Sequence, residues 1–249
     1  MSAKTVLITG ASRGIGRATA LGAAKQGWGV VVNYQHDQVA AESVVEQIRA
    51  ADGQAWAVQG DVAVEADVLQ VFDEAERRGT LAGVVANAGI VAPGALLADM
   101  PLERLRRMFD VNVLGAYLSA REAARRMMTS RGGQGGSLVL VSSMAAVLGS
   151  PGEYVDYAGS KGAVDSLTIG LAKELGPEGV RVNAVRPGLI DTEIHASGGR
   201  PDRAWALGVH TPLGRPGTAE EVASAILYLL GDDASFITGT FLDVAGGRR

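Results

Sequence analysis

Short runs of apolar, mostly β-branched residues alternate with longer amphipathic segments along the whole chain. The runs are expected to be strands and cover residues 5–8, 29–33, 55–59, 83–86, 137–142, 181–186 and 240–244. Nearly all their residues are apolar, which is typical of strands buried on both faces of a parallel sheet. The expected helices cover residues 15–26, 38–51, 64–78, 101–129, 155–175 and 218–230. This alternation predicts a doubly wound, Rossmann-like α/β domain spanning residues 1–249.

Composition excludes several classes of function. The formal net charge is −4, so no basic field favours nucleic acid or an anionic membrane. The chain has no cysteine and only three scattered histidines, which argues against disulfides, a thiolate nucleophile and a metal site. Residues 1–9 resemble no signal peptide, and no run of about 18 apolar residues follows. We therefore expect a cytoplasmic protein with no metal, nucleic-acid or membrane partner.

Three glycines follow the first expected strand. Gly10, Gly14 and Gly16 lie where residues 6–8 turn into the first expected helix. Glycines at such a strand-to-helix turn let backbone N–H groups approach a pyrophosphate at the helix N-terminus, where the helix dipole favours negative charge. The spacing is a variant of the common dinucleotide fingerprint, and its place in the α/β pattern predicts a dinucleotide site.

The end of the second expected strand bears on the type of nucleotide. NAD sites usually carry an acidic residue there that binds the ribose 2′-hydroxyl. This chain has Asn33 and Tyr34 instead, with no carboxylate before Asp37. Arg13, inside the glycine turn, could bind a 2′-phosphate. These residues favour NADP(H) over NAD(H), with a solvated Arg13 and use of both cofactors as the alternative.

Tyr157 and Lys161 stand four residues apart in an expected helix. That spacing places both side chains on one helix face, about 5–6 Å apart at Cβ. A fixed positive charge favours the phenolate and lowers the pKa of a tyrosine from about 10, which makes the tyrosine a usable acid or base. Such a pair alone is also typical of an ordinary helix surface with a snorkelling lysine.

Residues 188–217 break the alternating pattern. This stretch is punctuated by glycine and proline and has only weak helical signal. A long excursion in a compact domain is usually functional or disordered. Because it begins where a strand ends, we interpret it as a lid over a substrate site. Residues 131–136, RGGQGG, are expected to form a flexible surface loop.

Motifs in a fixed order carry a family resemblance. They are TGASRGIG at 9–16, Asp61-Val62, Asn87-Ala88-Gly89, Val111-Asn112-Val113, Ser142-Ser143, Tyr157-x-x-x-Lys161, and Arg186-Pro187-Gly188 followed by Thr192. From Thr5 to Gly247 the chain resembles the short-chain dehydrogenase/reductase superfamily, in its single-domain branch of about 250 residues.

The resemblance implies catalytic roles for four residues. Tyr157 would exchange a proton with the substrate oxygen, and Ser143, chosen over Ser142, would hydrogen-bond the same oxygen. Lys161 would lower the pKa of Tyr157 and hold the nicotinamide ribose. Asn112 would anchor a water between Lys161 and bulk solvent. Hydride transfer itself is the chemistry of the cofactor.

The resemblance also implies the cofactor contacts. Asp61 and Val62 would contact adenine, residues 87–89 the middle of the cofactor, and residues 187–192 the carboxamide. The expected cofactor-binding residues are Gly10, Ser12, Arg13, Gly14, Ile15, Gly16, Asn33, Tyr34, Asp61, Val62, Asn87, Ala88, Gly89, Tyr157, Lys161, Pro187, Gly188, Ile190 and Thr192. Helices 101–129 and 155–175 pack between subunits in most relatives, which implies a homotetramer.

A mostly apolar substrate pocket is expected beside these residues. Its walls are expected to comprise Val91, Ser143, Ala145, Val147, Tyr154, Tyr157, Leu189, Ile194, His195 and Trp205. Such a pocket suits a small or medium carbonyl compound or alcohol. The expected function is NADP(H)-dependent interconversion of a ketone or aldehyde with an alcohol. A 3-oxoacyl thioester reductase, an NAD(P)-dependent sugar or alcohol dehydrogenase and, more remotely, a non-catalytic NADPH sensor stay as alternatives.

Overall fold

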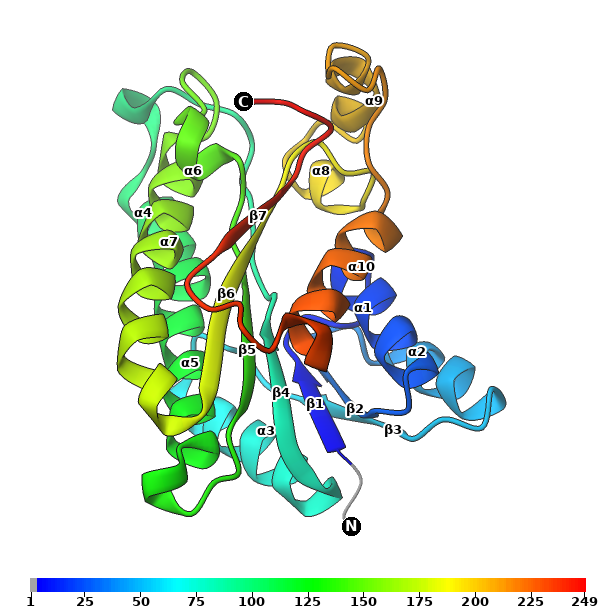
Figure 1. Cartoon of the computed structure of the whole chain (residues 1–249). Helices are drawn as coiled ribbons and strands as arrows, with labels where there is room; N and C mark the ends of the chain where they lie inside the picture. Colours follow the sequence, from blue (N-terminus) through cyan, green and yellow to red (C-terminus); the bar gives the residue numbers. More distant parts are fainter. Residues whose placement is uncertain (1–3) are drawn as a thin grey trace.

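Seven parallel strands form one sheet at the centre of the molecule (Figure 1). The computed structural model describes residues 4–249. In chain order the strands are β1 (Lys4–Ile8), β2 (Gly29–Tyr34), β3 (Ala55–Gln59), β4 (Thr80–Ala86), β5 (Gly136–Val141), β6 (Val180–Pro187) and β7 (Phe241–Val244). Their order in space is β3-β2-β1-β4-β5-β6-β7. The direction of winding therefore reverses between β1 and β4, and the predicted doubly wound fold is confirmed.

Helices cover both faces of the sheet (Figure 1). One layer contains α1 (Gly14–Lys25), α2 (Gln38–Ala50) and α10 (Ala219–Leu230). The other contains α3 (Glu65–Arg78), α4 (Leu102–Phe109), α5 (Gly115–Met127) and α7 (Val155–Leu175). Short 3-10 turns occur at η1 (Leu97–Asp99), η3 (Thr129–Arg131), η4 (Gly176–Glu178) and η5 (Asp232–Ala234).

The apolar strands supply a core on each side of the sheet. Successive side chains of a strand point to opposite faces. In β1, Val6 and Ile8 pack in the core beneath α1, α2 and α10, whereas Leu7 packs in the core beneath α3, α5 and α7. Both cores need apolar residues, which explains why the strands lack a polar alternation.

The expected helix over residues 101–129 is divided into three parts, so that prediction was wrong in detail. Helix α4 ends at Phe109, a π-helical turn η2 covers Asp110–Leu114, and α5 begins at Gly115. A π-helical turn inserts an extra residue and is frequent at functional sites. The buried residues of this turn are Val111 and Asn112.

The segment over residues 188–217 lies beyond the carboxyl end of β6 (Figure 1). It contains two short helices, α8 (Ile194–Ser197) and α9 (Arg203–Gly208). Its two ends are joined, because Asp191 N donates to Gly217 O at 2.9 Å and Gly217 N donates to Leu189 O at 2.9 Å. The segment is therefore a closed excursion fixed at its base, as a lid requires.

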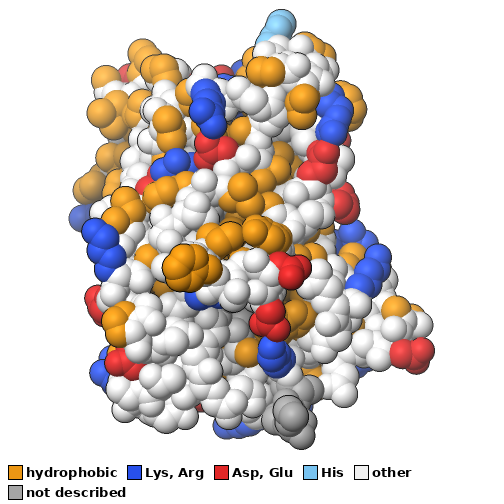
Figure 2. Space-filling view, viewed as in Figure 1, with side chains coloured by type: hydrophobic (Ala, Val, Ile, Leu, Met, Phe, Trp, Pro, Cys, Tyr) orange, Lys and Arg blue, Asp and Glu red, His pale blue; other side chains and the backbone are white. Residues whose placement is uncertain are grey.

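The outer surface is mixed in charge. On the face shown in Figure 2, Lys and Arg side chains are interspersed with Asp and Glu side chains. Within residues 4–249, no helix has the length and apolar character needed to cross a bilayer. The same residues bring together no group of three or more His, Asp or Glu side chains suited to a metal ion.

Candidate active site

Three positions of the turn between β1 and α1 are glycines. Gly10 and Gly14 adopt φ angles of +62° and +52°, a region that favours glycine. A Cβ added to Gly16 would lie 2.4 Å from the carbonyl oxygen of Gly10, so no larger residue fits there. The turn thus leaves the start of α1 open to a ligand, as a phosphate site requires.

Residues that follow β4 fix this turn across the switch point. The Asn87 Nδ2 atom donates to Thr9 O at 2.8 Å and to Gly10 O at 3.1 Å. In return, the Thr9 hydroxyl accepts from the backbone N–H groups of Asn87 and Ala88, both at 3.0 Å. Two adjacent strand ends are therefore held together where α/β folds bind their ligands.

A groove runs along the carboxyl ends of β1 to β4, and we call it the glycine-turn groove. Its walls include most of the predicted cofactor residues: Gly10, Ser12, Arg13, Gly14, Ile15, Asn33, Tyr34, Asp61, Val62, Asn87, Ala88, Gly89 and Thr192. The glycine-shaped floor and the helix terminus fit the pyrophosphate of a dinucleotide. Gly16 lies outside the walls because it is buried within the turn itself.

Asn33 shapes the groove from within. Its Oδ1 accepts from the N–H of Gly10 at 3.3 Å, and its Nδ2 donates to the carbonyl oxygens of Val58 and Gly60 at 3.3 and 3.1 Å. The side chain is 2% exposed. Its amide is therefore engaged with backbone and supports the glycine turn.

The carboxylates near the end of β2 already have partners. Asp37 caps α2 by accepting from the N–H of Ala40 at 2.9 Å. Asp61 Oδ2 accepts from Gln35 Nε2 at 2.5 Å and lies 3.4 Å from an Arg107 nitrogen. Arg13, by contrast, is exposed, and its guanidinium has no hydrogen-bond partner in the part of the chain that the structure describes. Arg13 therefore contributes an unpartnered positive charge to this groove, which the carboxylate of Glu193 also lines.

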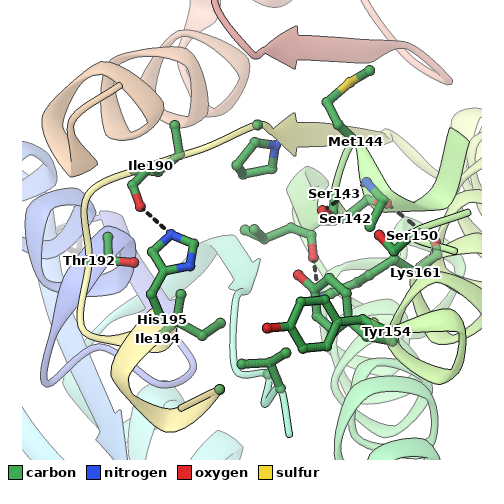
Figure 3. A pocket seen from close by; sticks show the side chains of 18 of the residues that line it. Ser142, Ser143, Met144, Ser150, Tyr154, Lys161, Ile190, Thr192, Ile194 and His195 are labelled. Carbon is green, nitrogen blue, oxygen red and sulfur yellow. Dashed lines mark hydrogen bonds between the residues drawn. The ribbon is translucent and has the colours of Figure 1, made fainter. Parts of the chain in front are cut away.

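A second cavity continues from the groove and contains the serine, tyrosine and lysine of the motifs; we call it the Tyr157 pocket. Ser143 follows β5, and Tyr157 and Lys161 come from α7. Figure 3 shows Ser143 and Lys161 on one side of the pocket and Thr192, Ile194 and His195 of the 188–217 segment on the other. Pro187, Gly188 and Ile190 also line it. Residues far apart in sequence thus converge on one space.

Burial raises the pKa of Tyr157 above its ordinary value of 10.0. A hydrogen bond from Ser143 and the positive charge of Arg203 act in the opposite direction but do not outweigh burial. The lowering of this pKa by Lys161 that the resemblance implied stays a prediction. In this structure the phenol is protonated at neutral pH and can act as an acid.

Lys161 is anchored to the sheet. Its Nζ donates to the carbonyl oxygen of Val141 at 2.8 Å and lies 5.7 Å from the centre of the Tyr157 ring. The side chain is nearly fully buried, and this burial lowers its pKa from 10.5 to about 8. The lysine therefore stays mostly protonated at pH 7 and is held by backbone beside the tyrosine.

The two adjacent serines have different surroundings. Ser142 is 1% exposed, and its hydroxyl donates to Asp165 Oδ1 at 2.6 Å. Asp165 is in turn bound by Arg186 at 2.7 Å. The hydroxyl of Ser143 bonds with Tyr157 and accepts from the N–H of Ala145 at 3.1 Å. Ser142 thus ties β5 to α7, and Ser143 is the serine placed beside the tyrosine.

Asn112 is bonded wholly to protein. Its Oδ1 accepts from Ile90 N at 2.8 Å, while its Nδ2 donates to Ile90 O at 3.0 Å and to Ser160 Oγ at 3.1 Å. A Cβ on Gly89 would lie 3.4 Å from both Asn112 Oδ1 and Lys161 Nζ. The π-helical turn therefore brings Asn112 close to Lys161, and the asparagine joins the loop after β4 to α7.

Three predicted pocket residues do not line the Tyr157 pocket, and these predictions were wrong. Leu189 is buried on the other side of its extended segment, because its neighbours Gly188 and Ile190 face the pocket. Val147 and Trp205 are each 57% exposed, and the Trp205 indole donates to Asp191 at 2.9 Å outside the pocket. Of the predicted residues, those that line it are Val91, Ser143, Ala145, Tyr154, Tyr157, Ile194 and His195.

Several pocket residues had no counterpart in the sequence prediction. They are Met144, Leu148, Ser150, Gly198, Arg203 and Arg248. Met144 could have been found from its place directly after Ser143. Arg203 and Arg248 carried no signal, because only the folded lid and the chain after β7 bring them to the pocket.

His195 is held in place by the lid backbone. One ring nitrogen, Nε2, lies 2.8 Å from the carbonyl oxygen of Ile190 (Figure 3). Burial and the nearby charge of Arg203 lower the pKa of His195 below 6.5, although the Ile190 bond and Asp191 act against them. The imidazole is therefore a neutral, oriented pocket wall at pH 7.

Known proteins resemble the chain over nearly its whole length. Residues 10–249 match a family model described as "Enoyl-(Acyl carrier protein) reductase". The chain is 50% identical to the "Uncharacterized oxidoreductase YgfF" of Escherichia coli (strain K12), covering 97% of this chain and 98% of that protein. It is 43% identical to an L-rhamnose 1-dehydrogenase (NAD(P)(+)) of Sphingomonas sp. (strain SKA58), covering 99% of this chain and 96% of the relative.

A solved structure gives the same result in three dimensions. A short-chain type dehydrogenase/reductase from Mycobacterium marinum superposes with a TM-score of 0.91 at 37% identity, covering 99% of this chain and 95% of that one. The sequence and structural similarities therefore agree.

Proposed function

The chain belongs to the short-chain dehydrogenase/reductase family of oxidoreductases, whose members use NAD(P)(H), and from this premise we propose its reaction. We propose that it is NADP(H)-dependent and interconverts a ketone or aldehyde with the corresponding secondary or primary alcohol. The observation that carries the proposal is the meeting of Ser143, Tyr157 and Lys161 in one pocket that continues from the glycine-turn groove.

The cofactor, when bound, supplies or accepts the hydride. Tyr157 donates its proton to the carbonyl oxygen during reduction and accepts the hydroxyl proton during oxidation. Its raised pKa keeps it protonated at neutral pH, which suits the role of acid. Ser143 donates a hydrogen bond to the same oxygen, and the buried Lys161 adds positive charge that favours proton release from Tyr157.

The residues of the glycine-turn groove would hold the dinucleotide. The turn over Gly10, Gly14 and Gly16 would bind the pyrophosphate. Preference for NADP(H) is supported by the end of β2, where Asp37 and Asp61 already have partners and Arg13 is free. A guanidinium binds a 2′-phosphate with two donors, and the side chain at the end of β2 itself is Tyr34, not the carboxylate typical of NAD sites.

We also propose that the protein is a homotetramer of the cytoplasm. The layer formed by α4, α5 and α7 exposes Leu102, Phe109, Tyr117 and Ile169, each at least 44% exposed. A Cβ added to Gly159 would meet nothing within 4 Å, so no backbone of the same chain explains this helix glycine. An apolar face that includes a bare helix backbone suits contact with another copy, and light scattering of the purified protein tests it.

The reaction is tested by following NADPH and NADH oxidation against a panel of β-ketoesters, diketones, aldehydes and quinones. Tyr157→Phe is assayed beside the wild type. We expect turnover with NADPH that falls by about 10²-fold or more in the variant. Binding of NADPH without turnover of any carbonyl or alcohol would contradict the reaction and favour a sensor.

A further inference from the structure

We infer that the substrate carries a carboxylate, bound by Arg203 and Arg248 on the lid side of the Tyr157 pocket. This inference rests on the proposed function, because it specifies the compound whose carbonyl or alcohol group reacts at Tyr157. The substrate class is an oxo acid and the matching hydroxy acid.

Arg203 begins α9 and projects from the lid into the pocket wall. Its side chain is 13% exposed, its Nη2 donates to Glu153 at 2.7 Å, and its guanidinium lies 5.2 Å from the centre of the Tyr154 ring. These contacts fix the direction of the guanidinium. Its Nη1 donates no hydrogen bond within residues 4–249 and is not buried from solvent, so two donors stay available to a ligand.

Arg248 reaches the same pocket from the end of the chain. After β7 the chain turns at Gly246 and Gly247, whose φ angles are +60° and +84°, and Gly246 O accepts from Leu213 N at 3.2 Å. The chain after β7 rises to the 188–217 segment and then turns back from it to the C-terminus (Figure 1). Arg248 is half-buried and lines the pocket, and its guanidinium has no ion-pair or hydrogen-bond partner in the described part of the chain.

The charges at this end of the pocket do not balance. Glu153 is the carboxylate in contact with Arg203, and it is shared with the exposed Arg200, whose Nη1 donates at 3.0 Å. His195 contributes no charge, because its pKa is lowered. Arg200, Arg203 and Arg248 thus bring three positive charges near the single carboxylate of Glu153, so two of these charges are not balanced. Arg203 and Arg248 also line the pocket, where they are only partly exposed to water. Half-buried cations of this kind are stabilised by an anionic ligand.

The field of Arg203 extends across the whole pocket. Its charge acts to lower the pKa values of Tyr157, His195 and Arg248, on which burial has the larger effect and for Tyr157 an opposite one. The pocket walls also include the apolar side chains of Val91, Leu148 and Ile194. One compound can thus place a carbonyl at Ser143 and Tyr157, an apolar body along these walls and a carboxylate at the arginines. Arginine forks bind carboxylates with two parallel hydrogen bonds.

The test compares oxo acids with their methyl esters. The series contains 3-oxo, 4-oxo, 5-oxo and 6-oxo straight-chain acids, so that the distance between carbonyl and carboxylate varies. We measure kcat/KM with NADPH for each acid and its ester, and take the ratio of acid to ester. At the best chain length we expect a ratio of about tenfold or more, the size of one charge-assisted hydrogen bond.

Three variants locate the source of that ratio. Arg248→Gln and Arg203→Gln are expected to lower the acid-to-ester ratio toward one. Arg200→Gln is the matched control, since Arg200 bonds the same Glu153 but does not line the pocket. Melting temperatures show whether each variant is folded, and Arg248→Gln removes no side-chain bond within residues 4–249.

The possible outcomes distinguish a failure of the carboxylate inference from a failure of the proposed reductase reaction. Equal rates for acids and esters at every length, with turnover that Tyr157→Phe abolishes, would overturn the carboxylate inference and leave the reaction intact. If no compound turned over, calorimetric titration of the same acids and esters into the NADPH-loaded protein would decide. Acid binding that Arg248→Gln weakens and Arg200→Gln does not would support the inference, and equal binding of acid and ester would overturn it.

Discussion

The Nζ atom of Lys161 lies 2.8 Å from the carbonyl oxygen of Val141, the last residue of β5. This contact joins helix α7, which also carries Tyr157, to the sheet and places the ammonium away from solvent. Burial favours the neutral amine, which explains the lowered pKa of about 8. Burial of the charged lysine therefore lowers the stability of the folded protein at neutral pH.

This lowered stability predicts a pH dependence of folding. Lys161 binds its proton less tightly in the folded state, at a pKa of about 8 against 10.5 when exposed. Between these values the unfolded chain binds more protons, so stability rises with pH. We expect urea unfolding to show wild type gaining stability from pH 8 to 9.5 relative to Lys161→Met. A constant difference between the two proteins over that range would contradict the burial of a charged Lys161.

The two serines after β5 are predicted to separate activity from stability. Ser143→Ala should lower kcat by about 10²-fold, the scale of one donor lost from a developing oxyanion, with little change in melting temperature. Ser142→Ala should destabilise the fold by about 1–3 kcal/mol, because Asp165 loses a buried donor. Assays of both variants by steady-state kinetics and thermal unfolding check this. The reverse pattern would assign the catalytic role to Ser142.

Much of the fold could be predicted from the sequence because the signals are local. Each strand is nearly all apolar, and the glycine turn stands directly between a strand and a helix. The strand over Ala55–Gln59 and the helix over Val155–Leu175 occur as expected. The π-helical turn at Asp110–Leu114 was not predicted, because the periodicity of the apolar residues continues through it.

The part of the site formed by residues close in sequence could be predicted from their spacing. The part formed by residues distant in sequence could be predicted less well. Tyr157 and Lys161 share a helix, so their proximity follows from spacing. The orientation of Leu189 and Trp205 depends on the lid backbone, which has no regular period. Burial raises the pKa of Tyr157, and the number of surrounding atoms that causes this is not encoded in a four-residue spacing.

Asn112 is predicted to stabilise the folded structure around the site. Asn112→Leu removes the bonds to both backbone groups of Ile90 and leaves these partly buried groups without their partner. We expect a loss of about 2 kcal/mol or more in unfolding free energy. Asn112→Asp keeps the acceptor for Ile90 N and should retain more stability at pH 7 than the leucine variant. Equal stability of the two variants would show that the Ile90 contact contributes little.

Arg13 is predicted to determine the choice of cofactor. Its guanidinium is free at the end of the groove, where Asp37 and Asp61 are engaged with Ala40 and Gln35. Arg13→Ala should weaken NADPH binding by about tenfold or more, since an arginine bond to a phosphate contributes about 1.5–3 kcal/mol. NADH binding should change little, because NADH has no 2′-phosphate.

Arg17→Ala is the matched control for this variant. Arg17 lies one helical turn beyond Arg13, but its guanidinium donates to Gln47 at 2.9 Å and lies outside the glycine-turn groove. Both cofactors are titrated by fluorescence at low and high salt, because a phosphate contact weakens as salt screens it. If Arg13→Ala and Arg17→Ala lowered NADPH affinity equally, the effect would be one of overall charge. A specific loss in Arg13→Ala that high salt reduces would place the 2′-phosphate at Arg13.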